Sequence, residues 1–164
     1  MVSEIFIRYL TTTGLEKIAR FRTDESAINL DLRDIASIDL LPLIWCENLE
    51  SLCIRNNSLI EIDLSPLEKC GKNLRAIRLS HNRLQEIDLN PLSFCPKLQE
   101  VLLDENRLKR VDLSPLFQCA NLKQLNLDKE VSLTADLLLR SVGSWPEVLI
   151  ERYHRILWKS DAIG

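Results

Sequence analysis

Side chains that could do chemistry recur at a regular interval along this sequence. They are Cys46, Cys70, Cys95 and Cys119, then Asp39, Asp63, Asp88 and Asp112, and then Asn57, Asn82 and Asn106. Thiolates are zinc ligands, carboxylates bind hard cations such as calcium, and amides recognise polar ligands. Successive members of each set lie 24 or 25 residues apart, so any site must be compatible with a repeated structure.

A repeated structure argues against a zinc site made by the cysteines. Four thiols on successive coils extend over roughly 14 Å, whereas the sulfurs of a zinc site lie about 2.3 Å from one ion. We therefore expect buried, reduced cysteines and no metal. The aspartates are expected to accept hydrogen bonds from nearby turn amides, and a bound cation is the alternative for them.

The best pair for nucleophilic catalysis is Cys53 with His81. These residues occupy different positions in adjacent copies, which separates them by roughly 10 Å along a strand, and a nucleophile needs its base at about 3 Å. The sequence therefore predicts no enzyme, no catalytic residue and no cofactor.

Each of these three sets forms a column, one residue per repeat, and an internal repeat supplies the elements that position them. Copies span residues 25–48, 49–73, 74–97 and 98–121, and a half-copy spans 122–133. Within a copy, apolar residues alternate, as in Ile77 and Leu79, which predicts a short half-buried strand. Neighbouring copies must supply the hydrogen-bonding partners, so the strands are expected to stack into a parallel sheet. The longer copy has its extra residue between Cys70 and Leu74, where we expect a loop.

The repeat resembles the leucine-rich repeat family, whose core pattern is LxxLxLxxN. Residues 74–82, LRAIRLSHN, and residues 98–106, LQEVLLDEN, match this pattern. The resemblance covers residues 25 to 133 and implies an α/β solenoid, a right-handed arc with a concave parallel sheet and short helical turns on the convex side. It also implies that Asn57, Asn82 and Asn106 form a structural ladder that bonds the backbone of adjacent coils.

The chain is expected to form one domain, 1–164, in which caps close the two ends of the repeat array. The N-terminal cap, 1–24, is predicted to hold a strand around EIFIRY and a helix over GLEKIARF, and the C-terminal cap, 134–164, is predicted to be helical. On the convex side, Ser65, Asn90 and Ser114 precede proline and are predicted helix N-caps. The aromatic residues Trp45, Phe94 and Phe117 are expected to pack between convex turns, and the alternative is an exposed patch of the kind that protein interfaces favour.

Composition narrows the function further. Leucine occupies 32 of 164 positions, glycine only 4, and the net charge is −3, which disfavours a glycine-dependent nucleotide site and general attraction to nucleic acid. No apolar run reaches the roughly 18 residues of a membrane span, and charges at Glu4 and Arg8 interrupt any signal-peptide core. An odd number of cysteines adds to the expectation of a reduced, cytoplasmic protein, which we expect to be a monomer.

The concave face is the predicted binding site. Its exposed positions place basic residues in the middle of the sheet and acidic residues toward the C-terminal end, namely Arg55, Arg75, Arg78, His81, Asp104, Glu105 and Asp128. Arginine binds carboxylates with two parallel hydrogen bonds, so the arginines would receive an acidic segment of a protein partner. The predicted function is a protein-protein interaction module, a scaffold, adaptor or regulatory subunit. The alternatives are a receptor for a small ligand or nucleic acid, and a structural spacer.

Overall fold

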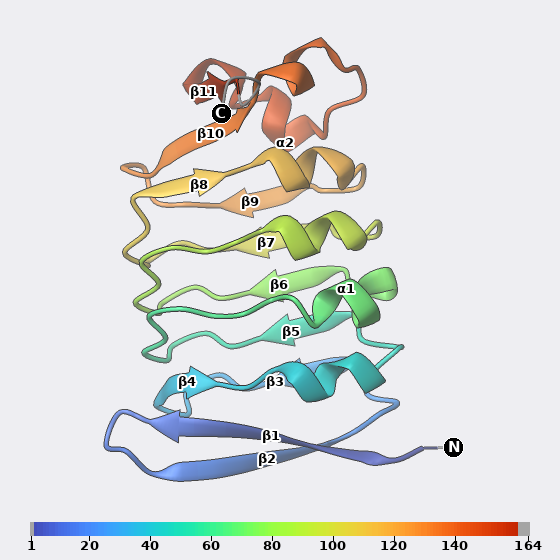
Figure 1. Ribbon diagram of the computed structural model, residues 1–164, viewed down its shortest axis with the longest axis vertical. Helices are drawn as coiled ribbons and strands as arrows, with labels where there is room; N and C mark the ends of the chain where they lie inside the picture. The colour runs from blue at the N-terminus through green and yellow to red at the C-terminus, as the bar shows by residue number, and fades with distance from the viewer. Residues whose placement is uncertain (1, 161–164) are drawn as a thin grey trace.

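The fold is a short solenoid in which each sequence repeat makes one coil (Figure 1). The computed structural model describes residues 2–160. Five short parallel strands line the concave side: β3 (Ala27–Asn29), β5 (Ser51–Cys53), β6 (Ala76–Arg78), β7 (Glu100–Leu102) and β9 (Gln124–Asn126). The middle residue of each strand is buried, in line with the predicted alternation, and the strands pair in register without slippage.

The convex side is made of helical turns that begin at the repeated prolines. Three are 3-10 turns, Leu41–Trp45, Asn90–Phe94 and Ser114–Gln118, and one is the single α-helical turn α1, Leu67–Cys70. Proline suits the start of such a turn because its missing N–H would have no partner there. The predicted side-chain caps at Ser65, Asn90 and Ser114 are wrong, because none of these turns has its N-cap hydrogen bond from a side chain at that position.

The extra residue of the longer copy lies in a tight turn. The 3-10 turn Gly71–Asn73 follows α1 directly, and Gly71 is buried beside the next coil. The insertion therefore enlarges the convex side and leaves the register of β5 with β6 unchanged.

The N-terminal cap is a β-hairpin, so the predicted helix over GLEKIARF is wrong. Strand β1 (Glu4–Thr11) pairs with β2 (Glu16–Arg22) in antiparallel register and also with β4 (Ile35–Ile38). Within β2, Ala19 is buried and its neighbours Ile18 and Arg20 are exposed, a period of two that fits a strand. Pairing with β1 thus overrides the helical spacing of the leucine and isoleucine residues.

The C-terminal cap combines two strands with short helical turns, so the prediction of a helical cap is only partly right. Strand β10 (Ser132–Asp136) pairs in parallel with β8 (Arg110–Asp112) and β11 (Ile156–Lys159). The helical parts are brief: the 3-10 turns Leu137–Ser141 and Tyr153–Arg155, and α2 (Glu147–Ile150).

The packing explains why no long helix forms in this cap. Leu149 and Ile156 are buried, but Ile150, Tyr153 and Leu157, which a helix would place on the same face, are exposed. Arg152 reaches from the cap to donate to the carbonyl of Leu125, 2.6 Å away, in the last concave strand. Residues 161–164 of the predicted cap lie outside the described residues.

One continuous apolar core runs between the concave and convex sides along the described chain. None of the helices within residues 2–160 has the length and apolar character needed to cross a membrane.

Candidate functional site on the concave face

The cysteine column lies inside the core. Cys46, Cys70, Cys95 and Cys119 are fully buried, and all are free thiols. Burial raises the pKa of Cys70 and Cys119 to about 11 and that of Cys95 to about 12. Within residues 2–160 no cluster of three histidine, cysteine or acidic side chains could hold a metal ion.

The aspartate column shapes the convex turns. Asp39, Asp63, Asp88 and Asp112 each accept a hydrogen bond through Oδ1 from the backbone N–H two residues later, at 2.9–3.0 Å. The bonds from Ser65 lower the pKa of Asp63. Asp136 makes the same bond to the N–H of Leu138, so the turn geometry continues one coil beyond the predicted half-copy.

The asparagine column connects adjacent coils. Asn82 Oδ1 accepts from the N–H of Leu59 at 3.1 Å, and its Nδ2 donates to the carbonyls of Ile54 and Leu79 at 2.7 and 3.1 Å. Asn57 and Asn106 make equivalent bonds to backbone groups of the preceding coil. These side chains face backbone groups, which places them in the framework beneath the concave surface.

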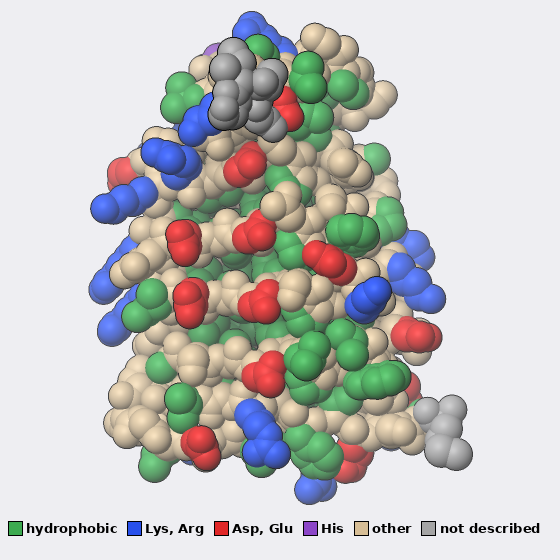
Figure 2. Space-filling view, viewed as in Figure 1, with side chains coloured by type: hydrophobic (Ala, Val, Ile, Leu, Met, Phe, Trp, Pro, Cys, Tyr) green, Lys and Arg blue, Asp and Glu red, His purple; other side chains and the backbone are tan. Residues whose placement is uncertain are grey.

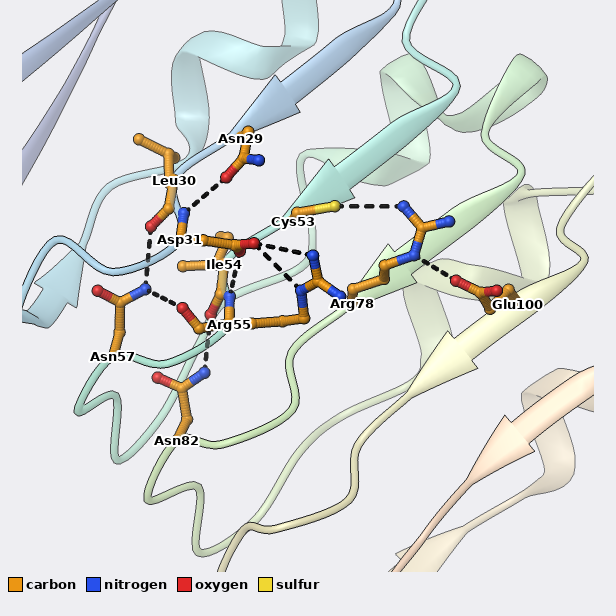
Figure 3. Close-up of polar contacts among 10 residues, drawn as sticks. All are labelled: Asn29, Leu30, Asp31, Cys53, Ile54, Arg55, Asn57, Arg78, Asn82 and Glu100. Carbon is orange, nitrogen blue, oxygen red and sulfur yellow. Dashed lines mark hydrogen bonds and ion pairs between the residues drawn. The ribbon is translucent and has the colours of Figure 1, made fainter.

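Arg55 and Arg78 are each held by a carboxylate from a neighbouring coil (Figure 3). Arg55 donates through Nε and Nη2 to Asp31 Oδ2 at 3.1 and 3.0 Å. The other oxygen of Asp31 accepts from the backbone N–H of Arg55 at 2.7 Å, so the carboxylate fixes both backbone and side chain. Arg75 pairs with Glu50 at 3.1 Å in a more exposed position.

Arg78 occupies the centre of the sheet. It donates through Nε to Glu100, and through Nη1 to the sulfur of Cys53 at 3.3 Å. The bond to the Cys53 sulfur, with the contact to Glu100, raises the pKa of the Arg78 guanidinium against the opposing effect of partial burial. The register pairs Cys53 with Arg78, whereas His81 lies three residues farther along, in the turn after β6.

Asp104 and Asp128, near the C-terminal end of the concave face, accept hydrogen bonds from within the chain. Asp104 accepts from the Ser80 hydroxyl at 2.6 Å, and Asp128 accepts from the backbone N–H groups of Glu105 and Asn106. The carboxylates that form ion pairs with the arginines are Asp31, Glu50 and Glu100.

The predicted site residues therefore form one surface with two regions. Arg55, Arg75 and Arg78 come together over β5 and β6. His81 and Glu105 are exposed at equivalent turn positions, both with left-handed backbone. Asp31 is a further site residue that the sequence analysis did not predict, although it stands 24 residues before Arg55, at the same position in its repeat.

The convex aromatics do not share one environment. Trp45 is 67% exposed and Phe94 is 55% exposed, so the expectation that they pack between turns is wrong. Phe117 is partly buried, and its ring centre lies 5.2 Å from that of Trp145 and 6.0 Å from that of Trp158. This cluster seals the C-terminal end of the core. Figure 2 shows one face of the molecule, on which acidic side chains lie among apolar ones.

Comparison with known proteins identifies the kind of repeat. The family model described as "Leucine rich repeat" matches residues 47–108. Among solved structures, internalin C2 of Listeria monocytogenes is 35% identical over 61% of this chain, with a TM-score of 0.50, and the chain covers 40% of its length. The ectodomain of the receptor kinase SOBIR1 of Arabidopsis thaliana is 20% identical over 88% of this chain and 74% of its own, with a TM-score of 0.57. No curated protein matches the sequence.

The fold and these matches define a leucine-rich-repeat solenoid, as the sequence pattern predicted. Such solenoids are commonly protein-interaction modules and are generally non-catalytic. The binding surface and the partner are specific to each protein, so they must be argued from the residues of this chain.

Proposed function

We propose that this chain is a non-catalytic adaptor or regulatory module that binds a protein partner on its concave face. The proposal depends on one observation: two guanidinium groups on adjacent coils are held by internal hydrogen bonds and still have N–H groups free to donate. Arg55 uses Nε and Nη2 internally, and Arg78 uses Nε and Nη1. Within residues 2–160, Nη1 of Arg55 and Nη2 of Arg78 have no hydrogen bond, so each remains able to donate to a partner.

These arginines are held in place before any partner arrives. Their side chains are 38% and 30% exposed, and each is anchored to a carboxylate on a neighbouring coil. A side chain already fixed in its bound geometry loses little entropy on binding, which favours affinity and specificity. A carboxylate of the partner suits the free N–H groups, because guanidinium–carboxylate hydrogen bonds are charge-assisted.

The acidic end of the face favours a partner segment with charges of both signs. Glu105 is exposed, and Asp128 is half-buried beside it. A segment with an acidic group over Arg55 and Arg78 and a basic group near Glu105 would complement both regions. Complementary surface charge mainly raises the association rate and selects the orientation of the partner.

The test exchanges a charge pair and keeps the ion pair itself. In the double variant Arg78→Glu/Glu100→Arg, one cation and one anion still face each other across β6 and β7, so the melting temperature should change little. Partner capture from native lysate, quantified by mass spectrometry, should fall severalfold. Wild-type capture should also weaken as salt rises, because exposed charges are screened beyond about 10 Å at 0.1 M ionic strength.

A matched control for that test is Arg83→Glu, which changes an exposed arginine that is not one of the concave arginines. It should leave capture unchanged. If the exchanged pair captures the same proteins at the wild-type level, the concave arginines do not form the binding site.

We also propose a cytoplasmic location. It is supported by the five cysteines, all of which are free thiols in the folded chain. Alkylation in denaturant at the moment of cell lysis, followed by reduction and a second label, should show no disulfide-linked cysteine. A large second label would contradict a reducing compartment.

A further inference from the structure

The outer edge of the N-terminal hairpin has the features of a pairing edge. Strand β2 is the last strand of its sheet, whose order is β2-β1-β4. It lies at the end of the molecule opposite β11 (Figure 1). It is seven residues long, longer than any strand of the concave sheet, and so offers an extended row of backbone groups.

The register shows which backbone groups of β2 point outward. Thr23 donates to Ser3 at 2.8 Å and Thr11 donates to Leu15 at 2.9 Å, which marks the pairs of odd-numbered residues as the hydrogen-bonded ones. Hydrogen-bonded and non-bonded pairs alternate in an antiparallel ladder. The backbone N–H and C=O groups at the even positions therefore face away from β1, at Glu16, Ile18, Arg20 and Arg22.

These outward groups are nearly all unused. Within residues 2–160, the backbone of Glu16, Ile18 and Arg20 makes no hydrogen bond on the outer side, and the Arg22 carbonyl accepts one from Glu25 at 3.2 Å. Ile18 is 53% exposed, which leaves an apolar side chain on the same edge.

We propose that β2 pairs with β2 of a second copy, in antiparallel register about a two-fold axis at Ala19. This register uses every outward-facing residue. It places Glu16 opposite Arg22 of the second copy, and by symmetry Arg22 opposite Glu16, with Ile18 opposite Arg20 of the second copy. Opposite charges that face each other across strands stabilise an antiparallel pair.

The charges around the edge favour a second copy over an unrelated strand. A second copy presents Glu16 and Arg22 at opposite ends of its own β2, so its charges complement those of the first strand in this register. Arg22 already contacts Asp24 at 3.0 Å and Arg20 approaches Glu4 at 3.7 Å. Glu16 makes no ion pair within residues 2–160 and is the residue that the second copy would satisfy.

The resulting dimer would join two hairpins into one continuous sheet and leave both concave faces open. It departs from the monomer expected from sequence, and it does not depend on the function proposed for the concave face. A contact limited to one pair of strands buries a small area, so the association should be weak and dependent on concentration.

Sedimentation velocity over a concentration series tests the pairing directly. The wild type should shift from monomer to dimer, and amide exchange at Ile18 and Arg20 should slow as the concentration rises. Arg22→Glu should raise the dimer dissociation constant about tenfold, because two exposed pairs become repulsive. The double variant Glu16→Arg/Arg22→Glu restores opposite charges across the strands and should recover association. Both variants place a carboxylate at position 22 beside Asp24, so this local repulsion does not account for a difference between them.

Two further variants separate pairing from loss of fold. Arg20→Pro removes an outward N–H and leaves the bonds to β1 intact, so it should abolish the dimer while the circular dichroism spectrum is retained. Arg83→Glu makes the same change in net charge elsewhere as Arg22→Glu and should not alter association. A wild type that stays monomeric throughout, or a dimer that is insensitive to both Arg22→Glu and Arg20→Pro, would overturn the proposal.

Discussion

A β-carbon on Gly71 would lie 2.5 Å from the sulfur of Cys95, far inside normal contact distance. The backbone angle φ of Gly71 is −86°, which any residue adopts, so close packing and not conformation requires glycine here. The glycine thus lets the additional turn of the 25-residue copy fit against the buried cysteine of the next coil.

The pair Gly71 and Cys95 gives the first prediction. Gly71→Ala should destabilise the fold by about 1–3 kcal/mol, as expected for a methyl group forced into a packed core. In a Cys95→Ala background the same change should cost much less, because the obstructing sulfur is gone. Urea denaturation of the four members of the double-mutant cycle measures this coupling.

Gly143→Ala is the matched control for that cycle, since a β-carbon there meets no atom within 4 Å. It should be close to neutral. Strictly additive effects of Gly71→Ala and Cys95→Ala would refute the contact.

The asparagine ladder predicts an unequal effect of two neighbouring substitutions. Asn82→Ala removes the partners of one buried N–H and two carbonyl groups, each worth on the order of 1–3 kcal/mol when left unsatisfied. Arg83→Ala changes an exposed side chain and should shift the unfolding free energy by less than about 0.5 kcal/mol. Equal denaturation midpoints for the two variants would contradict the ladder's structural role.

The buried thiols predict a loss of stability in alkaline solution. Burial raises the pKa of Cys95 to about 12 and that of Cys70 to about 11, whereas a thiol in the unfolded chain titrates near 8.5. Between these values the unfolded state has released a proton that the native state keeps, so unfolding becomes easier as pH rises. Each such cysteine contributes a slope of up to about 1.4 kcal/mol per pH unit.

Cys95→Ala should make this slope shallower between pH 9 and 11, on the order of one thiol's contribution. Denaturant titrations at several pH values provide the measurement. The same burial predicts slow thiol labelling in native buffer and complete labelling in denaturant. Parallel stability curves for wild type and Cys95→Ala would show that ionisation of Cys95 does not drive the alkaline loss.

The tryptophans predict two distinct mutational outcomes. Trp145→Ala removes contacts with both Phe117 and Trp158, at centroid distances of 5.2 and 5.3 Å, and should destabilise the C-terminal end by about 2–4 kcal/mol. Trp45→Ala removes an exposed ring and should cost under about 1 kcal/mol. Thermal denaturation compares the two, and the emission of the Trp45→Ala protein should be blue-shifted. Similar losses of stability would contradict a sealing role for the aromatic cluster.

The repeats were predictable from sequence, whereas the caps were not. Each coil repeats the same alternation, so Leu52, Ile77 and Val101 support one another as evidence for a strand. The strand over residues 16–22 has no second copy, and its local spacing fits a helix as well as a strand. Only its pairing with β1, a tertiary contact, selects the strand.

The concave positions of the arginines could be predicted from sequence, whereas their contacts could not. The concave location of Arg55 and Arg78 follows from the repeat register. Their contacts with Asp31 and Glu100 depend on the direction in which each side chain leans, toward the preceding coil for Arg55 and the following coil for Arg78. Sequence position does not specify that direction.

The unchanged strand register across the 25-residue copy also bears on how such a protein can change in length. β5 and β6 remain aligned despite the additional turn. A duplication that adds a copy one residue longer than its neighbours can therefore keep the strands in register, provided that the extra residue falls on the convex side. Each added copy would lengthen the array by one strand spacing, about 4.8 Å, between end structures that need no alteration. Growth by whole coils would thereby extend the row of surface positions open to evolutionary variation without disturbing those already in use.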